Sequence, residues 1–287
     1  MWGLPGAVLN IAHVGLSTWA MSASKIGDVA RRFGRCCATD AARVVENVRE
    51  GVVNCGGMKR KKEMMRRVAV LGATSGIGRA LVVRLREEGY EVVAVGRRRA
   101  LLETLGGETL TLDVTAPDAV AQVAALGVDT VIYNAGFGER TALPDASRTA
   151  RALEVNVIAF ERFAQWALTA CRCFVATASI AGVRGLEDTN GYSASKAYMI
   201  NAMEGYRRKA RHGGFACRYV TLLPGFVDTA MGQASRFWRC SAETAANVIV
   251  RGLQRGGEVL YVTPRWRWIA LLMRCLPRGI FERIPLK

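Results

Sequence analysis

The feature that most restricts the fold of this chain is a short apolar strand that leads directly into a glycine-rich turn and then a helix. The run Arg67-Val68-Ala69-Val70-Leu71 precedes Gly72-Ala73-Thr74-Ser75-Gly76-Ile77-Gly78, and residues 79–86 then show helical apolar spacing. Glycines let a backbone approach a pyrophosphate closely, and a helix amino terminus presents free N–H groups to it. This order predicts a dinucleotide site at Gly72, Thr74, Ser75, Gly76, Ile77 and Gly78. A tight turn that binds nothing is the alternative.

Further apolar runs alternate with helical patterns along the chain. Strands are predicted at 90–95, 109–114, 128–133, 173–178, 217–223 and 258–262, and the two longest helices at about 149–170 and 192–211. The alternation predicts an α/β fold, a doubly wound parallel sheet of about seven strands with helices on both faces. With 287 residues, 51% of them hydrophobic, the chain can bury one such core and needs no second domain.

The second predicted strand ends in a cationic cluster, Gly96-Arg97-Arg98-Arg99. An acidic residue at this place would hydrogen-bond a ribose 2′-hydroxyl, whereas arginines suit a 2′-phosphate. Arg97 and Arg98 therefore favour NADP(H) over NAD(H), with solvated arginines on the following helix as the alternative. Asp113, at the end of the third predicted strand, is placed to hydrogen-bond an adenine ring.

Three residues further along indicate a proton-transfer site. Tyr192 and Lys196 are four residues apart and so share one face of a helix. A nearby cation favours the phenolate and is expected to lower the phenol pKa from about 10. Ser179 follows the buried run 173–178, where its hydroxyl could bond the oxygen that Tyr192 protonates. A solvated tyrosine–lysine pair is the alternative, since Tyr-x-x-x-Lys is common on amphipathic helices.

Asn156 lies among apolar neighbours in the predicted helix 149–170. A buried asparagine must be hydrogen-bonded, so it serves either as a helix-packing device or as part of a relay.

The charge and the cysteines narrow the classes of function. The formal net charge is +16, but residues 1–67 carry twelve Lys/Arg against five Asp/Glu, and residues 264–287 carry six against one. The basic excess therefore concerns the partners of the two ends more than the central fold. No nucleic-acid reader motif accompanies it, so nucleic-acid binding is not expected. The eight cysteines and two histidines show no metal-ligand spacing, which predicts no metal site and reduced thiols in a cytoplasmic protein.

Both ends of the chain stand outside the predicted core, 58–263. Residues 1–57 fit neither a transmembrane helix nor a secretory signal, and their scattered acidic residues do not suit a transit peptide. They are expected to be a poorly ordered extension, or to precede a true start at Met58, Met64 or Met65. Residues 264–287 combine tryptophans, aliphatic residues and arginines, which predicts an amphipathic tail on an anionic membrane surface. The alternative is that this tail covers the substrate pocket or a dimer partner.

Taken together, these motifs resemble the short-chain dehydrogenase/reductase family in its single-domain form. The resemblance covers about Val68 to Val262 and rests on an ordered set of motifs. These are Gly72-x-x-x-Gly76-x-Gly78, Asn134-Ala135-Gly136, Asn156, Ser179, Tyr192-x-x-x-Lys196 and Pro224-Gly225. Leu71 departs from the family, which usually has a threonine there, but no catalytic group is missing.

The resemblance implies an NAD(P)-dependent oxidoreductase that acts on a carbonyl or secondary alcohol. Tyr192 would be the general acid or base, and Ser179 would orient the substrate oxygen. Lys196 would bind the nicotinamide ribose and lower the tyrosine pKa, while Asn156 would hold a proton-relaying water and Asn134 would brace the central strands. Cofactor contacts are also implied for Asn134, Ala135, Gly136, Tyr192, Lys196, Pro224, Gly225, Val227 and Thr229.

The substrate and the partners are less restricted by these residues. Residues 226–243 would form a flexible lid over an apolar substrate, and relatives are usually homodimers or homotetramers. A non-catalytic nucleotide-sensing or scaffold protein with the same fold is the rival hypothesis. The four intact residues Asn156, Ser179, Tyr192 and Lys196 argue against it, because a sensor does not need all of them.

Overall fold

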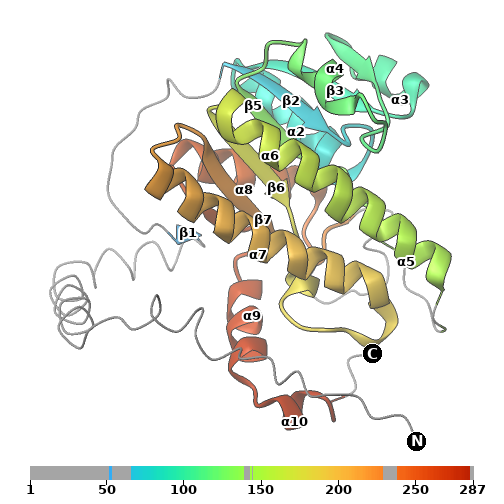
Figure 1. Cartoon of the computed structure of the whole chain (residues 1–287), viewed down its shortest axis with the longest axis vertical. Coiled ribbons are helices and arrows are strands. Elements are labelled where there is room, and N and C mark those ends of the chain that lie inside the picture. The colour runs from blue at the N-terminus through green and yellow to red at the C-terminus, as the bar shows by residue number, and fades with distance from the viewer. Residues whose placement is uncertain (1–51, 54–65, 139–142, 144, 229–237, 285–287) are drawn as a thin grey trace, which may run out of the picture. The chain divides into compact units, whose positions relative to one another are not determined.

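A computed structural model describes residues 52–53, 66–138, 143, 145–228 and 238–284. Its centre is an eight-stranded sheet in the order β1-β8-β7-β6-β5-β2-β3-β4 (Figure 1). All pairings from β8 to β4 are parallel, which confirms the predicted doubly wound sheet. These seven strands are β2 Arg67–Leu71, β3 Glu91–Gly96, β4 Thr109–Thr111, β5 Thr130–Tyr133, β6 Cys173–Thr177, β7 Arg218–Leu223 and β8 Val259–Tyr261.

The eighth strand was not predicted. β1, Val52–Val53, pairs antiparallel with β8, with Val52 opposite Leu260 and Val53 opposite Val259. These two valines belong to the stretch 1–57, for which no element was expected. The other residues of that stretch lie outside the described part of the chain.

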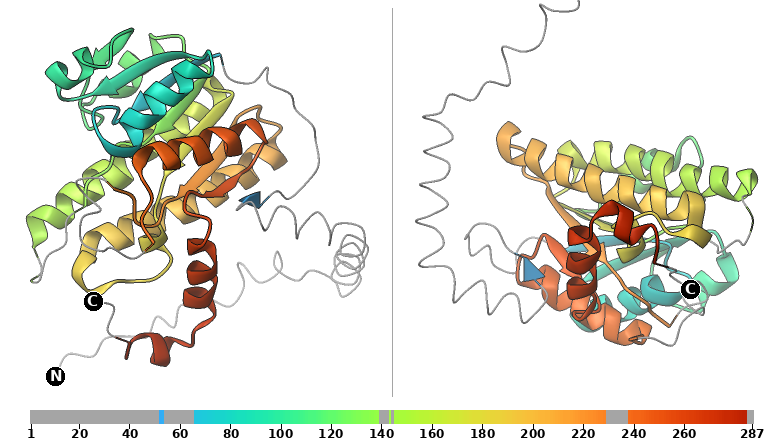
Figure 2. Two further views of the ribbon diagram at one scale, coloured as in Figure 1. Left: turned by 180° about the vertical axis from the view of Figure 1, so that it is seen from behind. Right: turned by 90° about the horizontal axis from the view of Figure 1, so that it is seen from below.

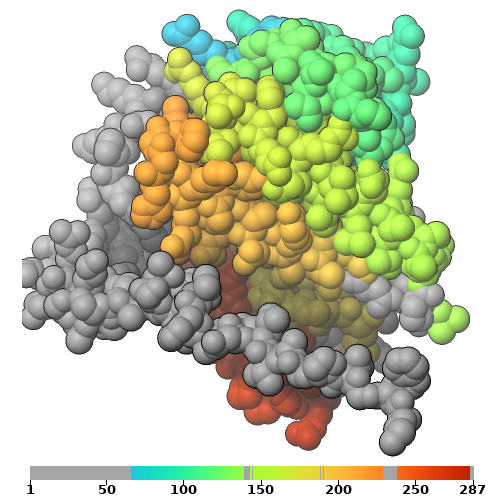
Figure 3. All heavy atoms as spheres, in the orientation of Figure 1, coloured from blue at the N-terminus to red at the C-terminus, as the bar shows by residue number. Residues whose placement is uncertain are grey.

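Helices cover both faces of the sheet. α2 (Gly76–Glu87) and α8 (Ala242–Gln254) lie together on one face, seen from behind in Figure 2. α4 (Ala119–Ala124), α6 (Phe160–Ala170) and α7 (Asn190–Gly213) cover the other, where α6 and α7 form a continuous layer in Figure 3. Successive strand residues point to opposite faces, so each strand supplies both layers. In β6, for example, Phe174 packs into one apolar cluster and Val175 into the other.

The long helix predicted at 149–170 is divided into three segments. α5 covers Ala146–Leu153, a π-helix covers Glu154–Ala159, and α6 follows directly. Apolar periodicity does not distinguish one wide turn from a regular helix, so the π-helix could not be predicted from the pattern.

The remaining elements are short or lie near the carboxyl end. They are α3 (Arg99–Glu103), the 3₁₀ turns Ile180–Gly182 and Glu187–Thr189, α9 (Trp266–Cys275) and α10 (Arg278–Phe281).

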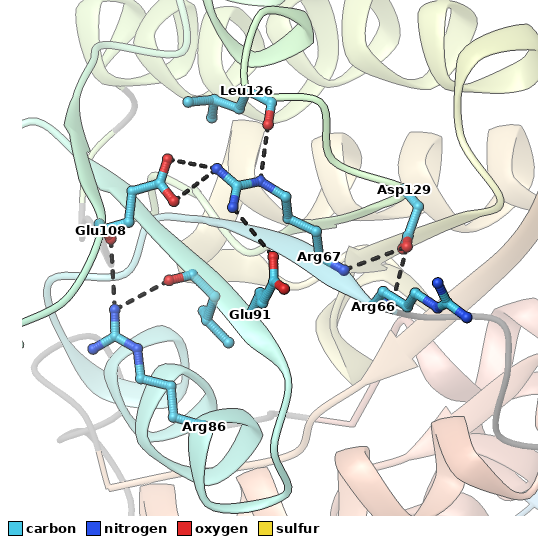
Figure 4. A network of polar contacts seen from close by, with 8 residues as sticks. Arg66, Arg67, Arg86, Glu91, Glu108, Leu126 and Asp129 are labelled. Carbon is cyan, nitrogen blue, oxygen red and sulfur yellow. Dashed lines mark hydrogen bonds and ion pairs between the residues drawn. The ribbon is translucent and has the colours of Figure 1, made fainter.

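A polar network joins the amino ends of β2, β3, β4 and β5 (Figure 4). The Arg67 guanidinium bonds both carboxylate oxygens of Glu108 at 2.7 Å, Glu91 at 3.3 Å and the carbonyl of Leu126 at 2.9 Å. Asp129 accepts the backbone N–H of Arg67 at 3.3 Å. Ion pairs of this exposure contribute about 0.2–1 kcal/mol each. The network therefore serves mainly to hold the strand ends in register, at the edge of the sheet opposite the motifs described next.

Candidate active site

The sequence motifs meet at the carboxyl edge of the sheet. β2, β5, β6 and β7 are neighbours in that order and run parallel. The segments that leave them carry the first glycine turn, the 134–136 motif, Ser179 and the 224–225 motif. Ligands of open parallel sheets bind outside the carboxyl ends of the strands, so topology alone brings these distant motifs together.

The glycine turn packs tightly against the segment after β5. Gly72 has a φ of +84°, and a Cβ on it would lie 2.8 Å from the backbone N of Ala135. A Cβ on Gly78 would collide with the carbonyl oxygen of Gly72 and lie 2.6 Å from Nδ2 of Asn134. Glycines at these positions are thus required by close backbone approach.

The amino terminus of α2 is suited to an anion. Its N-cap, Ser75, makes no side-chain cap hydrogen bond within the described chain, and its first turn holds no acidic residue. The helix dipole and N–H groups at this end therefore favour negative charge.

Arg98 lies beside this turn. Its guanidinium donates to Oγ1 of Thr74 at 2.6 Å and to Oγ of Ser75 at 2.9 Å. These hydrogen bonds bring Arg98, which follows β3, to the hydroxyl groups of the glycine turn that follows β2.

Asp113 lies between two further arginines. Arg97 is 3.6 Å from its carboxylate and Arg151 is 3.8 Å from it. Partial burial acts to raise the pKa of Asp113, but hydrogen bonds from Thr115 and the two arginines outweigh it and lower the pKa. Asp113 is therefore an ionised acceptor at neutral pH.

Asn134 connects the glycine turn to α7, the helix that carries Tyr192 and Lys196. Its Nδ2 donates to the carbonyl of Gly72 at 3.3 Å, and its Oδ1 accepts from Oγ1 of Thr177 at 3.0 Å. The carbonyl of Thr177 in turn accepts from Nζ of Lys196 at 2.7 Å. Asn134 thus bonds the ends of both β2 and β6.

Ser179, Tyr192 and Lys196 converge. Ser179 follows β6, and its Oγ accepts the N–H of Ala181 at 3.1 Å, which fixes the hydroxyl at the start of a 3₁₀ turn. Tyr192 lies in the first turn of α7 and shares a hydrogen bond with Ser179. Nζ of Lys196 lies 5.7 Å from the centroid of the tyrosine ring. A phenol, a hydroxyl and an amine thus face one place, as a proton-transfer site requires.

The electrostatics of this group differ from the expectation based on the sequence. Burial raises the pKa of Tyr192, and the hydrogen bond with Ser179 only partly offsets it. Lys196 is only 4% exposed, and burial lowers its pKa to about 7. The expected lowering of the tyrosine pKa by the lysine is therefore wrong in this structure. The amine donates to the carbonyl of Thr177, and desolvation of both groups dominates.

Asn156 is fully buried and its amide is bonded to protein. Nδ2 donates to the carbonyl of Phe137 at 2.7 Å and to Oγ of Ser195 at 2.9 Å, and Oδ1 accepts the N–H of Phe137 at 2.9 Å. Ser195 donates to the carbonyl of Tyr192 at 2.7 Å. Asn156 therefore ties the loop after β5 to the first turn of α7.

The segment after β7 approaches the serine loop, which is the stretch 178–189 that carries Ser179 between β6 and α7. The carbonyl of Pro224 accepts the N–H of Ile180 at 3.0 Å, and the N–H of Gly225 donates to Oγ1 of Thr263 at 3.0 Å. Val227 is buried and pairs with Cys240 in an isolated bridge. Thr229, and residues 229–237 of the expected lid, lie outside the described residues.

Two residues near the site were missed in the sequence. A Cβ on Gly138 would collide with the ring of Tyr192, so this glycine gives the tyrosine its space. Its place two residues after the 134–136 motif is the only signal that pointed to it. Arg184, in the serine loop, donates to the carbonyls of Met273 at 2.8 Å and of Leu276, and its guanidinium lies 5.0 Å from the ring centroid of Phe281. No sequence spacing reveals contacts of this range.

The described residues also bear on metal binding and on membrane insertion. The described residues contain no group of three or more His, Cys, Asp or Glu side chains that could hold a metal ion. None of the helices in the described part of the chain combines the length and apolarity needed to cross a membrane.

Known proteins share this sequence pattern. Residues 66–239 match the family model described as short chain dehydrogenase. An uncharacterized oxidoreductase of Myxococcus xanthus is 32% identical over 250 residues, covering 77% of this chain and 96% of the relative. A 3β-hydroxysteroid dehydrogenase of Mediterraneibacter gnavus is 28% identical over 211 residues, covering 64% of this chain and 74% of the relative.

Solved structures share the fold. A short-chain dehydrogenase of Burkholderia cenocepacia, in complex with NADP, superposes with a TM-score of 0.70 at 23% identity, covering 78% of this chain and 98% of that one. A short-chain dehydrogenase/reductase of Burkholderia phymatum, in complex with NAD, gives a TM-score of 0.67 at 20% identity, covering 79% and 99%.

Proposed function

Because this chain belongs to the short-chain dehydrogenase family, we propose that it transfers a hydride between NADP(H) and a carbonyl or secondary alcohol, with Tyr192 as general acid or base. The observation that carries the proposal is the convergence of Tyr192, Ser179 and buried Lys196 at the carboxyl edge of the sheet. A nucleotide sensor with this fold would not need to bury a lysine beside a tyrosine, since burying an amine is costly.

In this proposal the residues divide the proton chemistry among them. A substrate carbonyl oxygen would lie between the hydroxyls of Ser179 and Tyr192. The bound nicotinamide would supply the hydride to the carbonyl carbon. The raised pKa of Tyr192 keeps its phenol protonated, so Tyr192 would donate a proton to the substrate oxygen. Ser179 would stabilise the charge that develops on this oxygen by a hydrogen bond. Lys196 in its ammonium form would then stabilise the phenolate.

The glycine turn supports the nucleotide part of the proposal. Side chains at Gly72 and Gly78 would strike the backbone of the turn and of the 134–136 segment, so these glycines keep the turn compact. The amino terminus of α2, whose first turn holds no acidic residue, follows the same glycine turn. This arrangement fits a pyrophosphate, which needs close backbone N–H groups and no negative neighbour.

The arginines after β3 support NADP(H) over NAD(H). Arg98 lies beside the turn that would hold the adenosine phosphates, and no acidic residue stands at 97–99 to bind a ribose 2′-hydroxyl. The relatives of known structure include both NADP and NAD complexes, so the preference rests on this chain's own residues.

Replacing Arg98 by leucine tests this preference. We expect KM for NADPH to rise about tenfold or more, since a charge-assisted hydrogen bond contributes about 1.5–3 kcal/mol. The kcat/KM with NADH should stay within about twofold. The control is Arg99→Leu, which removes a neighbouring exposed arginine whose partner is Glu103. Equal losses with both cofactors would contradict the preference and assign Arg98 to the structure of the turn.

An apolar substrate is the class we favour. The Mediterraneibacter gnavus relative is a 3β-hydroxysteroid dehydrogenase. In this chain the aromatic residues Phe226 and Trp266 lie edge to face 5.1 Å apart beside the segment that leaves β7. Apolar side chains next to the reacting edge suit a substrate with an extended apolar part.

We also propose that α9 and α10 contact an anionic lipid surface. Trp266, Ala270 and Phe281 are buried, whereas Trp268, Leu271 and Leu272 are more than half exposed. Arg274 and Arg278 are exposed on the same helices. Tryptophans and aliphatic residues among arginines suit the headgroup region. Co-sedimentation with phosphatidylglycerol vesicles should occur and should fail with phosphatidylcholine vesicles; no difference between the two would refute the proposal.

The experiment that tests the main proposal is NADPH oxidation with a panel of aldehydes and ketones. Tyr192→Phe is expected to lower kcat by about 100-fold or more, as loss of a general acid does, while NADPH binding followed by fluorescence is retained. Tyr198→Phe is the matched control, because that tyrosine lies on the same helix and its hydroxyl donates to Glu161 at 3.1 Å. Equal rates for wild type and Tyr192→Phe would end the proposed mechanism.

A further inference from the structure

The π-helix Glu154–Ala159 has a support that lies outside its own helix. π-helices are rare and mostly occur as single turns within α-helices, often at functional sites. The hydroxyl of Tyr133 donates to the carbonyl of Val155 at 2.6 Å. Tyr133 is fully buried, and Val155 is 7% exposed. A buried hydrogen bond therefore holds the turn at the residue next to Asn156.

Tyr133 is well placed to act as a fixed donor. It is the last residue of β5, and its ring packs against Phe160, Phe163 and Phe174 with centroids 5.8, 5.7 and 6.5 Å away. The ring is thus locked on several sides. Burial raises the pKa of Tyr133 far above neutral pH, so the hydroxyl keeps its proton.

From Val155 the contacts continue to the catalytic tyrosine. Asn156, the next residue, bonds both backbone polar groups of Phe137 and the hydroxyl of Ser195. Ser195 bonds the carbonyl of Tyr192. A shift of the π turn would therefore move the side chain that connects the loop after β5 to the first turn of α7.

We propose that Tyr133 is a positioning residue for the reaction: its hydroxyl holds the π turn in the conformation that places Asn156 against Phe137 and Ser195, and so orients Tyr192. The role in catalysis rests on the proposed function above. The hydroxyl contributes through geometry alone, because it lies in the core and contacts the carbonyl of Val155.

The structure offers a closely matched control. The hydroxyl of Tyr219 donates to the carbonyl of Ala164 in α6, also at 2.6 Å, and Tyr219 is 1% exposed. Its ring lies in the same aromatic core, 5.7 Å from Phe174. Tyr133→Phe and Tyr219→Phe thus remove the same group from the same kind of bond, but only the first bond supports the segment of Asn156.

We expect both variants to lose a similar amount of stability in urea denaturation. Only Tyr133→Phe should lower kcat, by about tenfold, since small misplacements of reacting groups have effects of that size or more. Its KM for NADPH should stay within about twofold, because the glycine turn is not altered. Equal kcat values for the two variants would overturn the inference.

A double variant decides whether Tyr133 acts through Asn156. In an Asn156→Ala background, Tyr133→Phe should cause no further loss of kcat, because residues that act in one chain of contacts are not additive. Full additivity would show that Tyr133 affects catalysis by another route and would refute the proposal.

Hydrogen–deuterium exchange of the peptide covering 154–159 gives a readout that does not depend on activity. Tyr133→Phe should increase exchange there by about tenfold or more relative to Tyr219→Phe, and equal protection would overturn the inference. If wild type reduces no carbonyl of the panel, the proposed reaction fails, whereas the exchange result still decides whether Tyr133 holds the turn.

Discussion

Lys196→Met is expected to lower kcat/KM for carbonyl reduction by about 1000-fold or more while making the folded protein more stable. Activity falls because the variant loses the only amine beside Tyr192 among the described residues, and with it the charge that would stabilise the phenolate. Methionine matches lysine in length and fills the same buried space. The variant should therefore keep the fold and lose the chemistry.

Stability rises because the lysine is buried at a cost. Burial lowers its pKa from 10.5 to about 7, and each pKa unit corresponds to about 1.4 kcal/mol. Removing the amine should recover roughly 5 kcal/mol at most, less about 1 kcal/mol for the lost hydrogen bond to the carbonyl of Thr177. A gain of about 2–4 kcal/mol, or roughly 5–10 °C in Tm, is expected below pH 7.

The pH dependence of this gain has a definite sign. The pKa of Lys196 is lower in the folded protein than in the unfolded chain, so the folded state binds fewer protons between about pH 7 and pH 10.5. Wild type therefore loses stability as the pH falls through this range. The advantage of Lys196→Met should be largest below pH 7 and should shrink as the pH rises toward 10.

Differential scanning fluorimetry from pH 6 to pH 10 measures the effect. Lys209→Met is the control, because Lys209 is an exposed lysine on the same helix, and its Tm should change little at any pH. A Lys196→Met protein less stable than wild type at pH 6 would contradict the cost assigned to burial. Retained activity would contradict the role assigned to the amine.

Gly78→Ala is expected to destabilise the fold by about 4 kcal/mol or more, which is at the upper end for a single substitution. The new Cβ would collide with the carbonyl oxygen of Gly72 and lie 2.6 Å from Nδ2 of Asn134. A backbone atom cannot move aside as a flexible side chain can, so α2 would have to shift away from the glycine turn at Gly72. NADPH binding should be lost together with stability.

Gly205→Ala is the matched control, with the opposite expected sign. Gly205 lies within α7, and a Cβ there would meet nothing within 4 Å. Alanine in a helix interior is favoured over glycine by about 0.5–1 kcal/mol, so this variant should be slightly stabilised. Urea denaturation measures both. A Gly78→Ala protein as stable as wild type and still able to bind NADPH would show that the turn adapts.

The sequence predicted those parts of the fold that depend on local pattern. β2 was expected at the residues where it lies, because the buried run and the following glycines mark both of its ends. Once the strands were known to be parallel, their order placed Ser179 and the 134–136 segment at one edge. The family assignment followed from these motifs and is confirmed by the family model.

Features that depend on tertiary contacts could not be predicted. The π turn is set by the hydroxyl of Tyr133, a residue of another element. The space that Gly138 leaves for Tyr192 appears only when the loop and the helix are placed together. The shift of the Tyr192 pKa was predicted in the wrong direction. The four-residue spacing shows that Lys196 is near, but it does not show how deeply the two side chains are buried, and burial decides the direction. The roles of the site residues, the domain boundaries and the oligomeric state stay predictions.

The two carbonyl contacts of Arg184 have a consequence for how the carboxyl end communicates with the rest of the molecule. α9 and α10 cannot move outward without breaking their contacts with the guanidinium of Arg184. This arginine belongs to the same loop as Ser179. A displacement of these two helices would therefore be transmitted to the segment that follows Ser179. Arg184 would thus connect the lipid contact proposed for these helices to the serine proposed to act in the reaction.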